Sequence, residues 1–414
     1  MEKTRAFKIP KSTVKRAFEL VKANKGSHGV DKESLVQFEA NLKGNLYKLW
    51  NRMSSGCYFP SAVREVRIPK KSGGERILGV PTVMDRVAQM VVKLSFEPNV
   101  ESILLPDCYG YRPNKSALDA VEVTRSRCWQ WSWVLEFDIV GLFDHLPHDL
   151  LMKAVRAHTK ERWVILYIER WLKAPLEHPD GTQSERTAGT PQGGVISPVL
   201  ANLFLHYAFD LWMHRRYPNL RWCRYSDDGL VHCRTEPEAL ALKEALEQRF
   251  LSCGLRLHPE KTRVVYCRRG HGGRRYPTES FEFLGYCFRR RARRDSRRGT
   301  CATSFTPAVS KAAQKAMRAM IRRSDLRNRT DWDLVDISKR FNPVLRGWLN
   351  YYGHYRRTEM NSVLRHFNQT LVCWAARKFK RFHDGKRGAA RFIQEVARRQ
   401  PRLFVHWQEG KTFV

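Results

Sequence analysis

Three aspartates lie where a predicted strand ends or turns, and carboxylates placed there could hold a metal ion. Asp138 is near the end of the strand-like segment 133–139 (WVLEFDI), in which alternate side chains face opposite sides. It therefore points away from the apolar face that carries Phe137. Asp227 and Asp228 follow downstream, in a stretch whose pattern predicts strand, tight turn and strand, with the Asp-Asp-Gly sequence at the tip.

An Asp-Asp-Gly sequence is by itself most often only a turn. Here hydrophobic strands on both sides would make the tip rigid, and an isolated strand carboxylate, Asp138, precedes it. Three carboxylates brought together repel one another unless they share divalent cations, as in two-metal sites for phosphoryl transfer. Asp138 and Asp227 are the expected metal ligands. Asp228 is the weaker candidate, because its neighbour on the strand faces the opposite side.

Basic and glycine-rich segments near these acids fit a nucleoside triphosphate. Lys70 and Arg76 flank a glycine-containing turn between two short predicted strands, where they could donate charge-assisted hydrogen bonds to phosphates. The same turn is equally typical of a solvated hairpin tip. The loop 189–198 (GTPQGGVISP) leads into a helix at 199–205, and its small residues allow a base or sugar to approach the backbone.

Phe143 and Lys261 each allow two interpretations. A bulky ring five residues after Asp138 could lie under the sugar and exclude a 2′-hydroxyl, or it could be core packing. Lys261 could contact a phosphate or could be a solvated surface lysine.

The net charge identifies the class of partner. The chain has 414 residues, and 75 Lys and Arg against 41 Asp and Glu give a formal charge of +34. Its hydrophobic content of 42% is enough to bury cores, so the charge does not indicate disorder. A large folded protein of this charge is expected to bind a polyanion, and nucleic acid is the commonest one.

Cysteine spacing and hydropathy exclude other classes. The 10 Cys form no C-x-x-C pair, so a zinc module is not expected. We expect free thiols in a reducing cytoplasm instead. No apolar run approaches the roughly 18 residues that span a bilayer, and no secretory signal is visible. We therefore expect a cytoplasmic protein with no membrane partner.

The chain also divides by pattern. Residues 1–60 are predicted to be mainly helical, strands and helices alternate to about residue 287, and the arginine-rich run 289–298 is typical of a basic linker or loop. Beyond about 305 no strand is predicted. Helical spacing appears at 308–323 and 332–352, with a core stripe at Trp332, Phe341, Leu345, Trp348 and Leu349.

Short motifs follow one another in a fixed order over nearly the whole chain. They are 68–76 (IPKKSGGER), 79–86 (GVPTVMDR), 109–114 (YGYRPN), 137–144 (FDIVGLFD), 190–198 (TPQGGVISP), 225–228 (YSDD), 254–258 (GLRLH) and 283–286 (FLGY). One such motif would be weak, whereas the ordered set is specific. It resembles the reverse transcriptases of the group II intron maturase family.

The resemblance implies an α+β right-hand polymerase, with fingers and palm followed by an all-helical thumb and a basic C-terminal region. Its palm would carry Asp138, Asp227 and Asp228, and the backbone carbonyl of Ile139 would also bind a metal. The implied cofactors are two Mg²⁺ ions, with Mn²⁺ as a substitute. The domains expected are a helical extension (1–60), fingers and palm (61–288), a basic linker (289–304), a helical thumb or maturase domain (305–372) and a DNA-binding region (373–414).

Further roles follow from the same resemblance. Lys70, Arg76 and Lys261 would contact the incoming triphosphate, Phe143 would be the sugar gate, and Gln192 would line the nucleotide pocket. The primer end would be gripped by Phe283, Leu284, Gly285 and Tyr286.

The expected partners are an RNA template, a DNA or RNA primer, dNTPs, structured intron RNA and target DNA, bound by a monomer or a dimer. Ser226 stands where the family usually has Ala; both are small, so we expect activity to survive. No endonuclease module is expected after the basic tail, which favours priming from an existing end.

Two alternatives stay open. One is an RNA-binding splicing cofactor without chemistry of its own, and the other is a domesticated relative that serves phage defence or DNA repair. The acidic triad favours a polymerase over a pure RNA binder, because carboxylates facing a polyanion would repel it.

Overall fold

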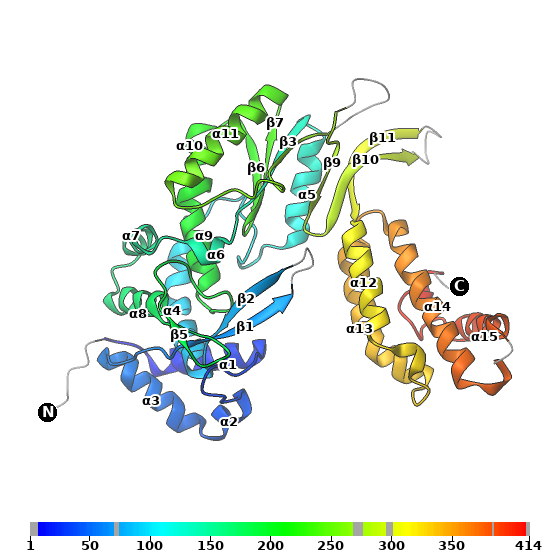
Figure 1. Cartoon of the computed structure of the whole chain (residues 1–414), viewed down its shortest axis with the longest axis horizontal. Helices are drawn as coiled ribbons and strands as arrows, with labels where there is room; N and C mark the ends of the chain where they lie inside the picture. Colours follow the sequence, from blue (N-terminus) through cyan, green and yellow to red (C-terminus); the bar gives the residue numbers. More distant parts are fainter. Residues whose placement is uncertain (1–6, 70–73, 268–275, 295–300, 383–384, 411–414) are drawn as a thin grey trace. The chain divides into compact units, whose positions relative to one another are not determined.

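The computed structural model describes residues 7–69, 74–267, 276–294, 301–382 and 385–410 (Figure 1). The chain divides into two compact units, which are described one at a time. Unit 1 comprises Met1–Ala120 and Leu135–Val264, and unit 2 comprises Val121–Val134 and Val265–Val414. Lys70 lies outside the described residues, so its predicted role stays a prediction.

Unit 1 begins with helices, as the sequence predicts. Helix α1 packs on α4, and Phe18 of α1 stacks on Phe38 of α2 with ring centroids 5.6 Å apart. Helix α4 begins after Thr82, whose hydroxyl accepts a hydrogen bond from the backbone N–H of Asp85 and so caps the first turn. The helices are α1 (Lys11–Asn24), α2 (Leu35–Ala40), α3 (Leu42–Ser55) and α4 (Val83–Glu101).

A small sheet next to these helices has the order β2-β1-β4-β5. Its first two strands form the antiparallel hairpin predicted around the basic turn, with Ile68 opposite Arg76. Strand β1 also runs parallel to β4. The strands are β1 (Val63–Pro69), β2 (Glu75–Val80), β4 (Leu176–Glu177) and β5 (Gln183–Ser184).

The second sheet, which carries the acidic residues, has the order β6-β7-β3-β8. Helix α11 packs on β7, and π-helix η1 continues directly from α9. The strands are β3 (Trp133–Asp138), β6 (Arg221–Tyr225), β7 (Asp228–Cys233) and β8 (Arg263–Tyr266). The remaining helices in this part of the chain are α5 (Ala117–Cys128), α6 (Leu142–His145), α7 (His148–His158), α8 (Arg162–Lys173), α9 (Ser197–Leu205), η1 (His206–Asp210), α10 (Leu211–Arg216) and α11 (Glu236–Ser252).

Unit 2 contains a three-stranded sheet where a basic linker was predicted at 289–304. Strand β9 (Ser280–Phe283) pairs with β10 (Tyr286–Arg294), which pairs antiparallel with β11 (Cys301–Val309) along its whole length. The linker prediction was wrong because the run of arginines hides the strand alternation. Buried rings hold the sheet together: Phe288 stacks on Phe281 at 4.7 Å, and Phe305 lies 6.0 Å from Phe281.

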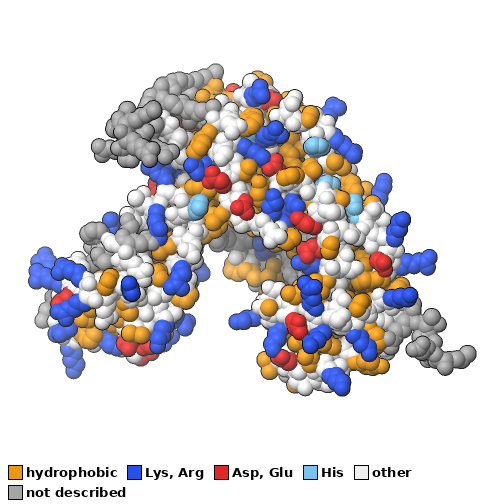
Figure 2. All heavy atoms as spheres, turned by 180° about the vertical axis from the view of Figure 1, so that it is seen from behind, with side chains coloured by type: hydrophobic (Ala, Val, Ile, Leu, Met, Phe, Trp, Pro, Cys, Tyr) orange, Lys and Arg blue, Asp and Glu red, His pale blue; other side chains and the backbone are white. Residues whose placement is uncertain are grey.

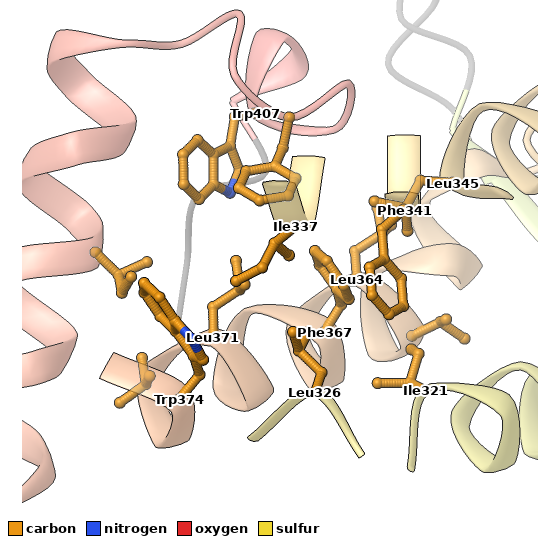
Figure 3. Close-up of a cluster of buried hydrophobic side chains, with 14 of the residues drawn as sticks. Ile321, Leu326, Ile337, Phe341, Leu345, Leu364, Phe367, Leu371, Trp374 and Trp407 are labelled. Carbon is orange, nitrogen blue, oxygen red and sulfur yellow. The ribbon is translucent and has the colours of Figure 1, made fainter. Parts of the chain in front are cut away.

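The rest of unit 2 is helical. The predicted helix at 332–352 is confirmed as α13, whereas the one predicted at 308–323 begins only at Lys311 as α12, because strand β11, which was not predicted beyond about 305, continues to Val309. Of the predicted core stripe, Phe341 and Leu345 are buried (Figure 3), as is Leu349, while Trp332 and Trp348 pack partly buried against the same cluster. The helices are α12 (Lys311–Arg323), η2 (Leu326–Asn328), α13 (Leu334–Tyr352), η3 (Arg357–Met360), α14 (Asn361–Lys378), η4 (Lys380–Phe382), α15 (Lys386–Arg399) and η5 (Trp407–Glu409).

The observed content of helices and sheets agrees with the predicted α+β class. Among the cysteines whose side chains are described, none forms a disulfide. In the described parts of the chain, no helix has both the length and the apolar character that crossing a membrane requires.

Candidate active site

Strand β3 places Asp138 on the face predicted from side-chain alternation. The ring of Phe137 lies on the opposite face, packed between Phe209 of η1 at 4.9 Å and Phe250 of α11 at 5.9 Å. Gly229 of β7 makes room for this ring, since a Cβ there would lie 2.1 Å from Phe137 Cζ. The aromatic core therefore fixes β3 and, with it, the direction in which Asp138 points.

The β6–β7 hairpin carries the other two aspartates, and its turn begins one residue earlier in the sequence than predicted. Tyr225 pairs with Asp228, so the turn consists of Ser226 and Asp227, and Asp228 is the first residue of β7. Ser226 has the left-handed φ of 58° that this tight turn requires. Gly229 is a ladder residue opposite Arg224, and its lack of a side chain serves the packing of Phe137 rather than the turn.

Burial and neighbouring charges perturb the ionisation of Asp227 and Asp228. Burial raises the pKa of Asp228 to about 7, and the negative charges of Asp227 and Asp138 add to the effect. Burial also raises the pKa of Asp227, with Asp138 contributing and Arg76 opposing. The surroundings of Asp227 and Asp228 thus disfavour the charged form of both carboxyl groups.

Lys261 supplies part of that charge. Its ammonium group donates a hydrogen bond to Asp138 Oδ2. Burial opposes the charge of Lys261, yet the hydrogen bond and the charge of Asp138 raise its pKa overall. The backbone is fixed at the same point, because His258 N–H donates to Asp138 O at 2.8 Å and Val140 N–H donates to Arg256 O at 2.9 Å. The sequence predicted a phosphate contact for Lys261 and gave no sign of this pairing.

The donor chemistry of this region suits a hard divalent cation. Carboxylate oxygens are the ligands that Mg²⁺ prefers, and the raised pKa values show carboxylates whose charge a cation would offset. Within the described residues, no three His, Cys, Asp or Glu side chains are grouped tightly enough to form a metal cluster by themselves. Ile139, whose carbonyl was the fourth expected ligand, is buried and forms an isolated antiparallel β-bridge with Leu257.

Gln192 is connected to the turn that carries Phe143 through Asp144, the residue that follows Phe143 in the chain. Phe143 lies on the single turn α6, and its carbonyl accepts a hydrogen bond from Thr190 N–H at 2.6 Å. Gln192 Nε2 donates to Asp144 Oδ2 at 3.2 Å. The glycine-rich loop is therefore attached to the turn that carries the predicted sugar gate.

Gly189 shows why this loop needs a residue without a side chain, and a backbone contact to Gly79 connects the loop to β2. A Cβ at Gly189, whose φ is 79°, would lie 2.6 Å from Phe143 O. Gly79 N–H on β2 donates to Gln192 O at 3.0 Å, which joins the loop to the strand that carries Arg76. The predicted nucleotide-contacting residues that the structure describes therefore lie on connected backbone segments of unit 1.

The predicted primer grip is the turn between β9 and β10 in unit 2. Phe283 pairs with Tyr286, and Leu284 and Gly285 form the turn with φ values of 52° and 78°. Tyr351 of α13 donates its hydroxyl to Leu284 O at 2.9 Å, and a Cβ on Gly285 would lie 2.7 Å from the Tyr352 hydroxyl. Helix α13 thus holds this turn in one conformation.

Sequence reasoning missed the buried polar groups beneath the hairpin. Arg224 of β6 and Asp210 of η1 form an ion pair in which both side chains are fully buried. The signal in the sequence was an arginine flanked by Trp222, Cys223 and Tyr225, and its partner lies in another element.

Comparison with known proteins agrees with this geometry. The sequence model of the reverse transcriptase (RNA-dependent DNA polymerase) family matches residues 68–288. The chain belongs to the reverse transcriptase family. A second model, the group II intron maturase-specific domain, matches residues 314–392 of this reverse transcriptase. The predicted membership of the group II intron reverse transcriptases and maturases is therefore confirmed, and with it the enzyme class, RNA-directed DNA polymerase.

Two relatives found by sequence, Protein YkfC and LtrA, support the same assignment. Protein YkfC of Escherichia coli is 31% identical over 334 residues, which cover 70% of this chain and 83% of that protein. Group II intron-encoded protein LtrA of Lactococcus lactis is 33% identical over 161 residues, 38% of this chain, and the match spans only 26% of LtrA. The telomerase structure from Candida albicans aligns with 91% of this chain and 68% of that one, at 11% identity and a TM-score of 0.44.

Proposed function

We propose that this reverse transcriptase extends a primer on an RNA template, with Asp138, Asp227 and Asp228 as its catalytic carboxylates. The observation that carries the proposal is their arrangement: β3 and the β6–β7 hairpin bring three partly buried carboxylates together, and burial, with the charges of the neighbouring carboxylates adding to it, raises the pKa values of Asp227 and Asp228. Asp138 and Asp227 would hold Mg²⁺, with Asp228 and the carbonyl of Ile139 as further ligands and Mn²⁺ as a substitute. Two bound ions would stabilise the attacking and leaving oxygens of the phosphoryl transfer.

The remaining residues bind and orient the substrate. Arg76 lies near enough to Asp227 for its charge to oppose the rise in the pKa of that carboxyl, and from there it would contact the phosphates of the incoming dNTP. The Lys261 ammonium group offsets the charge of Asp138 and would lessen the repulsion of an approaching phosphate. Gln192 would line the pocket, and Phe143 would exclude a 2′-hydroxyl.

Primer extension tests the activity. The purified chain, an RNA template with an annealed DNA primer, dNTPs and Mg²⁺ should give a full-length DNA product. Chelation with EDTA should stop extension, and added Mn²⁺ should restore part of it. Extension that continues unchanged in EDTA would contradict the proposed metal dependence.

A second role, binding of structured intron RNA to promote splicing, is favoured by the maturase-specific match at 314–392. On the face drawn in Figure 2, Lys and Arg side chains are spread widely, and Asp and Glu are fewer. Such a surface suits a folded polyanion. We propose that the protein lowers the Mg²⁺ concentration at which a group II intron splices. If the protein did not stimulate splicing at low Mg²⁺, the splicing role would be contradicted and only the polymerase role would remain.

The primer grip belongs to the same proposal. Phe283, Leu284, Gly285 and Tyr286 form a rigid turn against α13, and a rigid backbone turn can hold a primer end in one position. The tail from residue 373 would contact target DNA. Its arginines on α15 give that helix one strongly basic face.

A further inference from the structure

Arg224 and Asp210 form an ion pair at the base of the hairpin that carries Asp227. Both side chains are 0% exposed, and the contact is bidentate, with Nε to Oδ1 at 2.7 Å and Nη2 to Oδ2 at 2.6 Å. A buried ion pair commonly adds little net stability over apolar residues of the same size, because both charges lose their hydration. Its geometry is therefore the more informative property.

The guanidinium group connects the continuous α9–η1 helix, the hairpin turn and the loop that precedes α5, all in unit 1. Besides Asp210 on η1, Nη1 donates to Asn202 Oδ1 on α9 at 3.1 Å and to Ser226 O at the hairpin turn at 3.2 Å. Nη2 lies 3.0 Å from Cys108 Sγ in the loop that precedes α5. A planar fork with fixed donor directions can satisfy all these acceptors only when the segments keep one relative position.

The turn that receives this hydrogen bond is strained and closely confined. Ser226 holds a φ of 58°, a conformation that a non-glycine residue keeps only where its surroundings enforce it. Gly110 closes the other side, since a Cβ there would lie 2.5 Å from Ser226 N. The Asn202 side chain donates a hydrogen bond to Gly110 O at 2.7 Å, so the same network also fixes the segment that packs against the turn.

From these contacts we propose that Arg224 and Asp210 are positioning residues of the polymerase reaction. By holding the Ser226 carbonyl, the ion pair fixes the turn in the conformation that points Asp227 and Asp228 toward Asp138. This inference rests on the proposed catalytic role of those carboxylates. It adds two residues that touch neither the substrate nor the reacting atoms.

Asp210→Asn is the sharpest perturbation, because it keeps the shape of the side chain and removes the charge that orients the fork. We expect kcat for primer extension to fall by about tenfold to a hundredfold, as small displacements of reacting groups do. The KM for dNTP should change by less than about threefold, because the nucleotide contacts are elsewhere. Arg224→Lys should lower kcat in the same way, since lysine keeps the positive charge but lacks the planar guanidinium group that makes several hydrogen bonds at once.

Asp85→Asn is the matched control. Asp85 is also a buried acid of unit 1, and it accepts hydrogen bonds from Tyr58 and Thr82 without contacting the hairpin. Its loss should lower the melting temperature and leave kcat near wild type at temperatures where the protein is folded. An Asp210→Asn or Arg224→Lys enzyme that loses stability but keeps the wild-type kcat would overturn the positioning role.

Hydrogen exchange gives a second readout that does not depend on activity. In Asp210→Asn the amides of the segment 224–229 should exchange faster, while Asp85→Asn should leave them unchanged. Unchanged exchange there would also overturn the proposal. If the chain proved not to extend primers at all, the kinetic comparison would fail for every variant, but the exchange result would still decide whether the ion pair holds the turn.

Discussion

A single methyl group at Gly229 should displace the strands that carry the acidic residues. In Gly229→Ala the new Cβ would lie 2.1, 2.5 and 2.7 Å from Phe137 Cζ, Cε1 and Cε2. Nonbonded carbons normally approach to about 3.5–4.0 Å, so all three contacts are forbidden. The Phe137 ring is 1% exposed and lies between Phe209 and Phe250, so it has no open space into which it can move.

The expected cost of this overpacking is about 3 kcal/mol, at the upper end of the usual range. The higher strand preference of alanine over glycine offsets about 0.5–1 kcal/mol. A net loss of about 2 kcal/mol should lower the melting temperature of the chain by several degrees. Because Gly229 follows Asp228, and Phe137 precedes Asp138, we also expect primer extension to slow by about tenfold or more.

The compensating variant is Phe137→Leu, which removes the three ring atoms that clash. Alone it should cost about 1 kcal/mol for the lost packing. Combined with Gly229→Ala it should restore stability and part of the extension rate, so that the two changes are strongly non-additive. Thermal unfolding and primer extension on all four proteins measure this. Additive effects, or a harmless Gly229→Ala, would refute the packing argument.

Three further predictions follow from other sites. Phe143→Ala should raise ribonucleotide incorporation relative to dNTP incorporation while Phe143→Tyr keeps the selectivity; unchanged discrimination in the Ala variant would mean that Phe143 is only packing. Gly285→Ala should weaken primer use, seen as a raised KM for the primer, and should also lower the melting temperature, because its Cβ would meet the Tyr352 hydroxyl and the φ of 78° disfavours a side chain; an unchanged primer KM would contradict the grip. Burial lowers the pKa of His406 to about 3 in the folded protein. Below about pH 6.5 the unfolded chain therefore binds a proton that the folded protein does not. The free energy of unfolding should fall by about 1.4 kcal/mol for each pH unit below that value, until the pKa of the folded state is reached. That part of the slope should vanish in His406→Asn, and identical slopes for the two proteins would show that His406 is not held neutral.

Local patterns in the sequence were enough to predict the direction of Asp138 but not the register of the turn before Asp228. Alternation along 133–139 gave the direction of Asp138, because the ring of Phe137, the residue before it, packs in the aromatic core. Helical spacing gave α12 and α13. The order of motifs gave the family, which the match over 68–288 confirms.

Contacts between distant segments could not be predicted in the same way. The pairing of Lys261 with Asp138 depends on how the chain returns to the end of β3, which no local pattern encodes. Likewise, Arg224 gave no indication of its partner Asp210. The prediction of a linker at 289–304 failed for a different reason. A run of arginines has no alternation of polar and apolar side chains, which is the sequence sign of a strand. The strand is evident only in the structure, from the pairing of β10 with β11 and the stacking of Phe281 on Phe288.

The central claim is that Asp227 takes part in the chemistry of primer extension. The most direct measurement compares single-turnover extension on an RNA template by the wild type, Asp227→Asn and Asp180→Asn, an exposed acid in the turn before β5. The account predicts that Asp227→Asn binds the primer–template as the wild type does but extends it at least about a thousandfold more slowly, the scale expected for removing electrostatic stabilisation at the reacting centre. Asp180→Asn should be indistinguishable from the wild type. Wild-type rates in Asp227→Asn would contradict the account.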